Sequence, residues 1–499
     1  MNFKTVFLLL LLVIFNLSCK NNKKVSSEVQ DSKVTTSNTV KRKPNIIVLL
    51  CDDLGYGDLS SFGHPIIETP NLDKLAESGI RLTNFYSTAP VCSPSRAGLL
   101  TGRSPNKAGI YDFIPGRKKS PDNRDLVHLQ AHEVTIPSLL KSVGYSTCLV
   151  GKWHCSSRFN SDKQPQPNDF GFDHWMATHN NAAPSHRNPK NFIRNGNEVG
   201  EIEGFSSQII VDEAMNWLGN KKDNNPFFLE VTFHEPHEPI ASPENLVQKY
   251  LPKAKNKEEA EYFANVENVD IAVGRLIAYL QKKDLDENTL IVFSSDNGPE
   301  TFMRYHRAKK SYGSPGELRG MKLWTNEAGF RVPGIISWLG NDKMFSGTSE
   351  KVVSALDFLP TFCDLAGVDL SNRKLDGESF TSLLNTGEFN REKPLIWAFY
   401  DAINTRRVTL RKDEWKIMAK LSVNGEELPH IHNLADSNID LVKSAKLTDF
   451  VLFNLKDDID ESEDLSDKEP KVFEDMKALI QMEYKKLLDE SHIWIREEN

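Results

Sequence analysis

Cysteine is scarce in this chain, which has six in 499 residues. Their spacing shows no disulfide framework of the kind that holds small secreted folds together, so a disulfide-built fold is excluded. We expect buried free thiols at Cys51, Cys148 and Cys363. The spacing leaves open whether a single disulfide forms.

An excess of positive charge is also missing, because the formal net charge is -8 at pH 7. Proteins that bind nucleic acid normally present a basic face, so we expect no nucleic-acid partner. Any anionic substrate must then be attracted by a local cluster of basic side chains.

Long apolar runs are absent beyond the N-terminus, so no later segment is predicted to cross a membrane. With 39% hydrophobic and 26% charged residues, the composition is that of a globular protein. The length suffices for one large domain and a smaller one.

The first residues are typical of an export signal. Lys4 precedes an apolar run at residues 6–15, which is about ten residues long and too short to span a bilayer. Cys19 follows this run and resembles the cysteine of a bacterial lipobox, which becomes lipidated. Asn16 stands where a lipobox has leucine, so an ordinary signal peptide is the alternative. Residues 20–44 are polar and are predicted to form a flexible tether.

A short motif at residues 92–96, Cys-Ser-Pro-Ser-Arg, has the form of the tag that a maturase uses to convert a cysteine to formylglycine. The motif fixes three positions, so roughly two matches are expected by chance per hundred chains of this length. The rest of the chain must therefore supply the other parts of a site.

Apolar runs alternate with helical patterns along the body of the chain. Thr69 and Pro70 open one predicted helix, which closes at Gly79, and residues 258–283 carry an apolar stripe of helical period. Five runs read as buried strands: 46–50, 147–150, 227–233, 290–293 and 332–337. This alternation predicts an α/β fold with a large, doubly wound, mostly parallel sheet flanked by helices.

Polar side chains follow four of these predicted strands. They are Asp52 and Asp53, Lys152 and His154, His234 and His237, and Asp296 and Asn297. Ligands bind outside the carboxyl ends of strands in open α/β sheets, so we expect the four groups to meet in one site. Each group alone could be a turn or a helix cap, but four together favour a shared site.

These motifs resemble those of the formylglycine-dependent type I sulfatases, which are arylsulfatase-like members of the alkaline phosphatase superfamily. The matching segments run in family order over about residues 44–340, and Ala328 replaces a usual glycine. They are Asp52-Asp53, Cys92 to Arg96, Thr101 to Arg103, Gly151 to His154, His237 to Pro239, Asp296 to Gly298, Gly320 to Lys322 and Glu327 to Pro333. The resemblance implies an alkaline phosphatase-like fold and the hydrolysis of sulfate esters.

The resemblance also implies roles for individual residues. The implied metal ligands are Asp52, Asp53, Asp296, Asn297 and the modified side chain at Cys92. The implied sulfate pocket is completed by Arg96, Lys152, His154, His237 and Lys322. In the family, His154 would be the base that collapses the sulfated intermediate, and His237 or Lys322 would protonate the leaving oxygen. Oxygen ligands of this kind suit Ca²⁺ best, with Mg²⁺ as the alternative, and disfavour zinc.

Substrate specificity is expected from two basic segments, residues 174–194 and 303–322. Within them we assign substrate contacts to Arg304, His306 and Arg307; the alternative is that these loops are simply solvated. His234 competes with His237 for one role. The family motif matches His237, so His234 is placed among the substrate-binding residues, with a structural histidine as the alternative.

Short apolar runs beyond residue 392 and an amphipathic helix at about 471–488 predict a smaller antiparallel sheet with a helix. The acidic segment 457–467 is predicted to be a solvated loop. The predicted organisation is a lipoprotein signal peptide at 1–19, a tether at 20–44, a catalytic α/β domain at 45–391 and a C-terminal α+β subdomain at 392–499.

We therefore expect an exported, periplasmic or outer-membrane lipoprotein of a bacterium, anchored through Cys19. It would desulfate oligosaccharides derived from sulfated polysaccharides, after a maturase has converted Cys92. The enzymatic alternative is a phosphodiester or phosphonate monoester hydrolase of the same superfamily. A third alternative is a glycan-binding lipoprotein without catalytic activity.

Overall fold

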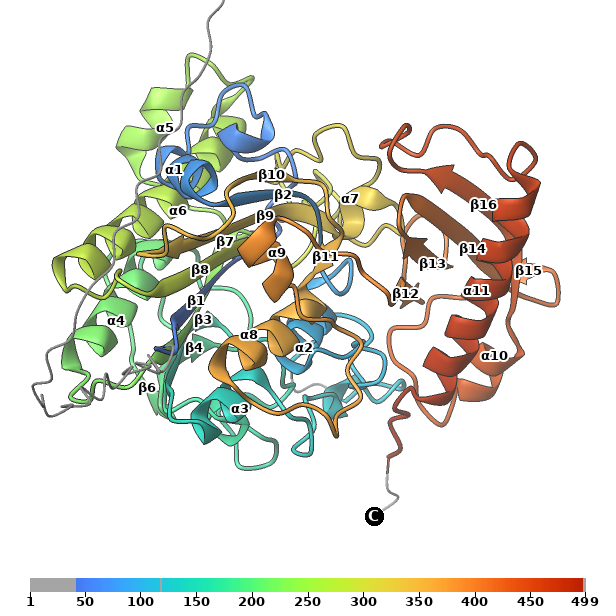
Figure 1. Ribbon diagram of the computed structural model, residues 1–499, viewed down its shortest axis with the longest axis horizontal. Coiled ribbons are helices and arrows are strands. Elements are labelled where there is room, and N and C mark those ends of the chain that lie inside the picture. Colours follow the sequence, from blue (N-terminus) through green and yellow to red (C-terminus); the bar gives the residue numbers. More distant parts are fainter. Residues whose placement is uncertain (1–41, 117–118, 497–499) are drawn as a thin grey trace, which may run out of the picture. The chain divides into compact units, whose positions relative to one another are not determined.

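The computed structural model describes residues 42–116 and 119–496 (Figure 1). The fold below is that of the unit formed by residues 43–499. The predicted signal peptide, Cys19 and nearly all of the tether lie outside the described residues. Within the described ranges, no helix is both long enough and apolar enough to cross a membrane.

The centre of the large sheet is parallel. Its strands, in spatial order, are β8 (Thr289–Ser295), β1 (Asn45–Asp52), β7 (Phe227–Pro236), β3 (Ser146–Lys152) and β4 (His174–Thr178). Every residue of β7 and β8 is buried, as expected for parallel strands covered on both faces. The predicted parallel sheet and four of its buried strands are confirmed.

Antiparallel pairs extend this sheet on both sides. β9 (Arg331–Leu339) runs antiparallel to β8 and to β2 (Ile80–Tyr86), so the predicted strand at 332–337 is present but reversed. β2 was not predicted, because its polar residues interrupt the apolar run. The remaining strands are β5 (Ile193–Arg194), β6 (Asn197–Glu198), β10 (Gly347–Ser349) and β11 (Val353–Ser354).

Helices cover both faces of the large sheet (Figure 1). In β1, Ile46, Val48 and Leu50 face one core, while Ile47 and Leu49 face the other. The first core is closed by α2 (Cys92–Thr101), α3 (Ile136–Ser142), α8 (Phe358–Ala366) and α9 (Thr381–Thr386). The second is closed by α1 (Pro70–Ser78), α4 (Ser206–Asn220), α5 (Glu244–Tyr250) and α6 (Lys257–Lys282). Alternation along one strand therefore builds two cores.

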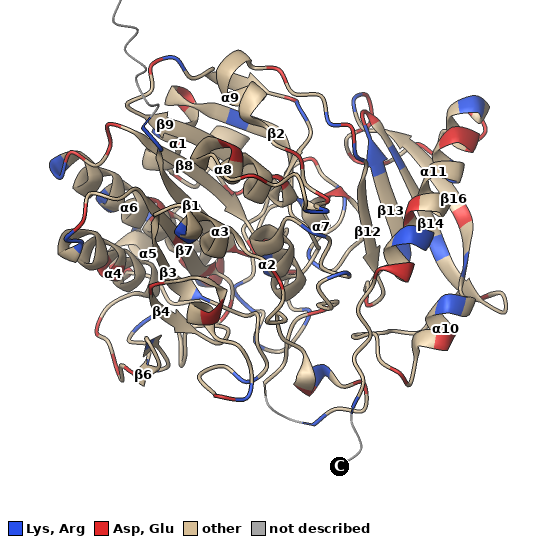
Figure 2. Cartoon of the chain, turned by 60° about the horizontal axis from the view of Figure 1, so that its bottom comes forward, with Lys and Arg blue, Asp and Glu red and all other residues tan. Residues whose placement is uncertain are grey.

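The predicted second sheet is confirmed. Its strands are β12 (Leu395–Phe399), β13 (Arg407–Lys412), β14 (Trp415–Val423), β15 (Glu426–Glu427) and β16 (Lys446–Asn454), all paired antiparallel. α11 (Pro470–Asp489) and α10 (Ile439–Ser444) pack on it and share a separate core. Figure 2 shows both signs of charge interspersed along these two helices. The boundary at residue 392 stays a prediction.

Short helices complete the described fold. α7 (Glu327–Phe330) immediately precedes β9, and 3₁₀ helices lie at Ser60–Phe62, Arg124–Leu126, Pro167–Phe170 and Ala355–Asp357. All five cysteines of the described ranges are buried and unbridged, which confirms the free thiols expected at Cys51, Cys148 and Cys363.

A buried ion cluster joins the two sheets. Lys416 of β14 places its Nζ 2.8 Å from Glu327 Oε1 and 2.8 Å from Glu461 Oε1, and all three side chains have no exposed surface. Glu461 lies in the acidic segment that was predicted to be a solvated loop. That prediction is wrong for Glu461, because its carboxylate turns inward to Lys416.

Candidate active site

The four polar groups meet at the carboxyl ends of the parallel strands. Asp52 ends β1 and Lys152 ends β3, and Lys152 Nζ donates to Asp52 Oδ2 at 2.6 Å. Lys322 Nζ donates to Asp53 Oδ1 at 2.6 Å, and His237 Nε2 lies 3.5 Å from Asp53 Oδ2. Asp53 and Lys322, which are 269 positions apart in sequence, are thus brought into contact at the strand ends, as expected.

The segment 92–96 is the first turn of α2, and it is fixed to two strands. Cys92 is the first helical residue and is buried. Arg96, one turn later, places its Nη2 2.7 Å from Asp296 Oδ2 and donates from Nη1 to Lys152 O at 2.9 Å. The start of a helix also directs backbone N–H groups outward, which favours an anion there.

The carboxylates offer oxygen atoms to a cation. Ligand atoms of Asp52, Asp53 and His237 lie within 4.8 Å of one another. Among the described residues, Asp52 Oδ1 and Asn297 Oδ1 are buried without a hydrogen-bond partner. Buried oxygens of this kind are costly unless something binds them. The oxygen atoms present therefore fit a hard divalent ion, and His237 Nε2 faces Asp53 beside them.

Burial and neighbouring charges set the protonation of the site. Burial raises the pKa of Asp52, but the nearby Lys152 and His237 lower it more, so the net pKa lies well below its usual range. Burial and the charge of Asp52 raise the pKa of Asp296 to about 6. Burial raises the pKa of the Cys92 thiol to about 11, so an unmodified thiol is protonated at neutral pH.

The two predicted proton carriers have different surroundings. His154 is fully buried, its Nε2 lies 3.1 Å from Ile114 O, and its Nδ1 has no hydrogen-bond partner among the described residues. A ring that donates from Nε2 to a carbonyl leaves Nδ1 as an acceptor. His237 Nδ1 lies 2.6 Å from Glu238 O, which directs its Nε2 toward Asp53. Burial lowers the pKa of both rings.

The comparison with known proteins agrees with this geometry. The sequence model of the family described as Sulfatase matches residues 44–368. Arylsulfatase A of Homo sapiens is 33% identical over 385 residues, which cover 72% of this chain and 72% of the relative. The chain belongs to the sulfatase family. It is a sulfuric ester hydrolase, and the alternative of a binding protein without catalytic activity is set aside.

Other relatives of this sulfatase act on named sugars or were solved with one. N-acetylgalactosamine-6-sulfatase of Homo sapiens is 32% identical and covers 71% of this chain and 68% of its own length. A crystal structure of Ps i-CgsB in complex with k-i-k-neocarrahexaose is 30% identical, with a TM-score of 0.73, and covers 91% of this chain and 95% of its own. Phosphonate monoester hydrolase of Agrobacterium radiobacter, at 18% identity and a TM-score of 0.53, shares the fold.

His234 lies in the interior of the sulfatase. One ring nitrogen is 2.7 Å from Thr178 Oγ1, the other is 2.7 Å from Ser206 Oγ, and the residue has no exposed surface. Both nitrogens are thus engaged by the protein. This arrangement matches the alternative of a structural histidine and leaves no ring atom for a substrate contact.

The predicted basic loops differ in how far their charges are already paired. Arg304 makes a two-pronged ion pair with Glu300, at 2.7 Å for each contact, while His306 and Arg307 are exposed. In the segment 174–194, both His174 and Arg194 contact Glu213. Exposed basic side chains therefore lie at His306 and Arg307 and also at Arg187 of the other segment, and the substrate contacts predicted for the loop around residue 306 stay a prediction.

Sequence reasoning missed a second cluster of titratable side chains. Asp112, Asp401 and His432 offer ligand atoms within 4.8 Å of one another. None of them follows a strand of the parallel sheet, and no motif links them. Only the fold brings them together.

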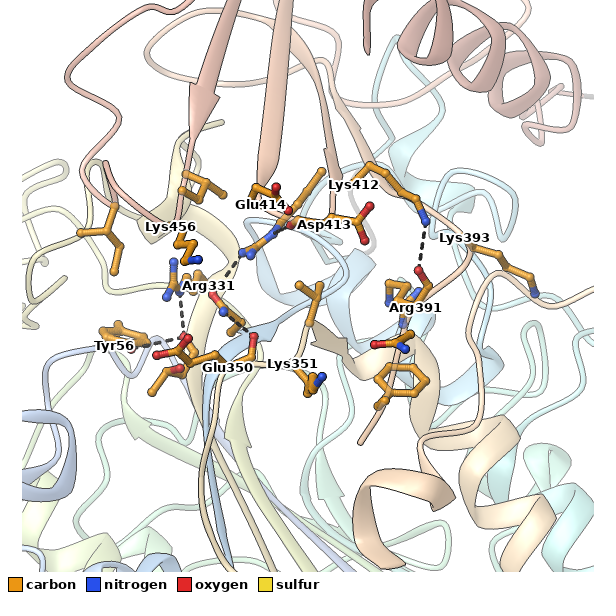
Figure 3. Close-up of a pocket in the computed structure, with 18 of the residues that line it drawn as sticks. Tyr56, Arg331, Glu350, Lys351, Arg391, Lys393, Lys412, Asp413, Glu414 and Lys456 are labelled. Atoms are coloured by element: carbon orange, nitrogen blue, oxygen red, sulfur yellow. Dashed lines mark hydrogen bonds between the residues drawn. The ribbon is translucent and has the colours of Figure 1, made fainter. Parts of the chain in front are cut away.

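A cavity of about 640 Å³ opens elsewhere, between β2 and β9 of the large sheet and the second sheet (Figure 3). Arg331 and Lys456 line it together with Glu350 and Glu414, so both signs of charge face the space. Within the described ranges, no predicted metal, catalytic or substrate residue is among its lining residues. The cavity is therefore separate from the strand-end site.

Proposed function

We propose that this sulfatase removes sulfate groups from oligosaccharides derived from sulfated polysaccharides, with a formylglycine at residue 92 and a bound divalent cation, Ca²⁺ in preference to Mg²⁺. The observation that carries the proposal is the single cluster in which Asp52, Asp53 and Asp296 meet Lys152 and Lys322 beside residue 92. Such a mixture of buried charges suits a site that holds a cation and an anion together.

The chemistry of the donor set supports the proposed ion. Asp52, Asp53, Asp296 and Asn297 would hold it through oxygen atoms, two of which are buried and unpaired in the structure. Hard oxygen ligands select Ca²⁺ or Mg²⁺. When bound, the ion withdraws electron density from sulfate oxygens.

Residue 92 is proposed to supply the nucleophile, because the hydrate of formylglycine offers a hydroxyl group for attack on sulfur. The chain's own cations then hold the sulfate. Arg96 and Lys152 are fixed by ion pairs on one side, and Lys322 on the other. Preorganised cations of this kind stabilise charge that develops in the transition state.

Two histidines are proposed to move protons. His154 Nδ1, which has no hydrogen-bond partner among the described residues, would accept a proton near residue 92. His237 is partly exposed and would donate to the leaving sugar oxygen, with Lys322 as the alternative donor. Proton transfer by positioned groups of this type contributes about 10²- to 10⁴-fold to a rate.

A sulfated saccharide is proposed as substrate for two reasons. Relatives include an N-acetylgalactosamine-6-sulfatase and a structure solved with a neocarrahexaose. In addition, His306 and Arg307 offer exposed basic side chains on the loop between Pro299 and Lys322. This loop is tied to the site because the backbone N–H of Lys322 donates to Pro299 O. Export, lipidation at Cys19 and conversion by a maturase remain part of the proposal and rest on the sequence.

The test compares 4-nitrophenyl sulfate with an aryl phosphate diester, using protein co-produced with a formylglycine-generating maturase. We expect faster turnover of the sulfate, loss of turnover in Cys92→Ala, and loss on removal of divalent ions with restoration by Ca²⁺. Faster turnover of the phosphate diester would instead support the phosphodiesterase alternative. Full activity of Cys92→Ala would overturn the role of residue 92.

A further inference from the structure

We propose that Asp112, Asp401 and His432, together with the exposed side chains of Phe113 and Ile403, form the subsite that binds the sugar ring carrying the scissile sulfate. The proposal rests on the proposed function and adds the part of the site that recognises the saccharide. The bound ring would present free hydroxyl groups, and not a further sulfate group, to this side of the site.

The cluster runs from the interior to the surface. His432 Nδ1 lies 3.1 Å from Asp112 Oδ2 and 2.9 Å from Asp401 Oδ2. The Asp112 side chain is fully buried, and its Oδ1 has no hydrogen-bond partner among the described residues, whereas His432 is 35% exposed. A buried carboxylate oxygen without a donor is a place where a ligand hydroxyl group would bind.

The segment around Asp401 borders residue 92. Ala402 belongs to the same small buried cluster as Cys92 and Leu323. The backbone N–H of Ile403 donates to Leu323 O at 3.1 Å, and Leu323 directly follows Lys322. The two residues that follow Asp401 therefore contact residue 92 and the neighbour of a sulfate-binding lysine.

The segment around Asp112 borders the site from another direction. Ile114 O lies 3.1 Å from His154 Nε2, and the N–H of Ile114 donates to Ser93 Oγ at 3.0 Å. Ser93 is the neighbour of Cys92. Ile114 thus contacts the neighbour of residue 92, and Ala402 and Ile403 contact Cys92 and Leu323, although one segment follows α2 and the other follows β12 of the second sheet.

Two large apolar side chains are exposed on these same segments. Phe113 is 41% exposed and Ile403 is 39% exposed. Exposed apolar groups beside polar side chains are typical of a ligand-binding surface. The C–H face of a pyranose ring packs against an aromatic ring, while its hydroxyl groups donate to carboxylates. The combination of Phe113 with Asp112 and Asp401 therefore fits a sugar.

The charges and hydrogen-bond donors in the cluster disfavour two other ligands, a second sulfate group and a metal ion. A second sulfate group has no hydrogen to donate to these carboxylate oxygens, so the anionic parts of a longer substrate would face the basic loop around Arg307 instead. A resident metal ion is disfavoured because Arg124 Nη1 lies 3.5 Å from Asp112 Oδ2 and His430 Nδ1 lies 2.8 Å from Asp401 Oδ1. These groups compensate the negative charge that a metal ion would need, whereas the carboxylate oxygens keep lone pairs for a further hydroxyl donor.

The experiment measures kcat/KM for a defined sulfated oligosaccharide and for 4-nitrophenyl sulfate in Asp401→Asn and Phe113→Ala. The aryl substrate lacks the sugar ring. The kcat/KM for the oligosaccharide divided by the kcat/KM for 4-nitrophenyl sulfate therefore measures recognition of the ring. We expect the ratio to fall about tenfold or more in Asp401→Asn, which is the size expected for a hydrogen bond to a charged group. A smaller fall in the same direction is expected for Phe113→Ala.

Matched controls are Asp449→Asn and Met482→Ala, which change an exposed aspartate of β16 and an exposed apolar residue of α11. An unchanged ratio in both controls and a lowered ratio in both test variants would support the subsite. Equal losses on the two substrates, or an unchanged ratio, would overturn it. If Asp401→Asn does not fold, the kcat/KM ratio of Phe113→Ala still tests the subsite, because Phe113 is exposed. A wild-type protein inactive on both substrates would count against the proposed function itself.

Discussion

Replacing Lys416 by methionine should destabilise the protein strongly, because this side chain contacts two buried carboxylates and is itself fully buried. Its Nζ lies 2.8 Å from both Glu327 and Glu461, and none of the three side chains reaches solvent. Methionine matches the length of the aliphatic stem but removes the charge. Glu461 would then stay buried without this ion pair, while Glu327 would keep the hydrogen bond from Tyr86 and the 3.4 Å contact with Arg331 Nη1.

The expected loss in the free energy of unfolding is about 3–5 kcal/mol, the range found when one partner of a buried ion pair is removed. Burial raises the pKa of Glu461, so this carboxylate can take up a proton in the variant, which keeps the loss within that range. With a urea dependence of about 4 kcal/mol per molar for a protein of this size, the unfolding midpoint should fall by about 1 M.

The assay is urea unfolding followed by tryptophan fluorescence and by circular dichroism. The matched control is Lys420→Met on the same strand, where the lysine pairs with Asp449 at the surface. We expect the control to change the free energy by less than about 1 kcal/mol. A fall in the urea midpoint for Lys416→Met no larger than that for the control would show that the buried ion pairs stabilise the fold no more than a surface pair does.

Three further predictions follow from the site. Arg96→Ala should lower kcat on 4-nitrophenyl sulfate by about 10²- to 10³-fold, because it removes a fixed donor to the developing charge, and release of 4-nitrophenol measures this loss. Dialysis against a chelator should lower the melting temperature as well as the activity, since Asp52 and Asp53 lose the ion that separates their charges; an unchanged melting temperature would speak against a bound ion. Hydrogen bonds to Asp112 and Asp401 raise the pKa of His432 to about 9, above its ordinary value of about 6.5. Its stabilising contribution is therefore complete below about pH 6.5 and is lost as the pH rises through about 9, so the urea midpoint of the wild type should approach that of His432→Gln over this interval.

Much of the fold could be predicted, because strands buried on both faces require continuous apolar runs and this chain has them at β1, β3, β7 and β8. β2 escaped prediction because its partly exposed residues interrupt the run. The direction of β9 could not be read from its residues, since a buried antiparallel strand and a parallel one have the same apolar pattern.

The strand-end site could be anticipated for a topological reason, since parallel strands bring their carboxyl ends to one edge. The contacts made by the second sheet could not be anticipated from the sequence. Glu461 lies in an acidic segment, and nothing local shows that its carboxylate meets Lys416. Asp112 and His432 are 320 positions apart and belong to no motif, so their contact appears only once both sheets are folded.

The central claim is that residue 92, once converted to formylglycine, is the nucleophile that releases sulfate from a saccharide. The most direct measurement is sulfate release from a sulfated oligosaccharide, by ion chromatography, for protein made with and without the maturase. The mass of the peptide containing residue 92 is determined in each preparation. The rate should rise in proportion to the converted fraction, and Cys92→Ala should release no sulfate. Equal rates in converted and unconverted protein would mean that formylglycine is not the nucleophile.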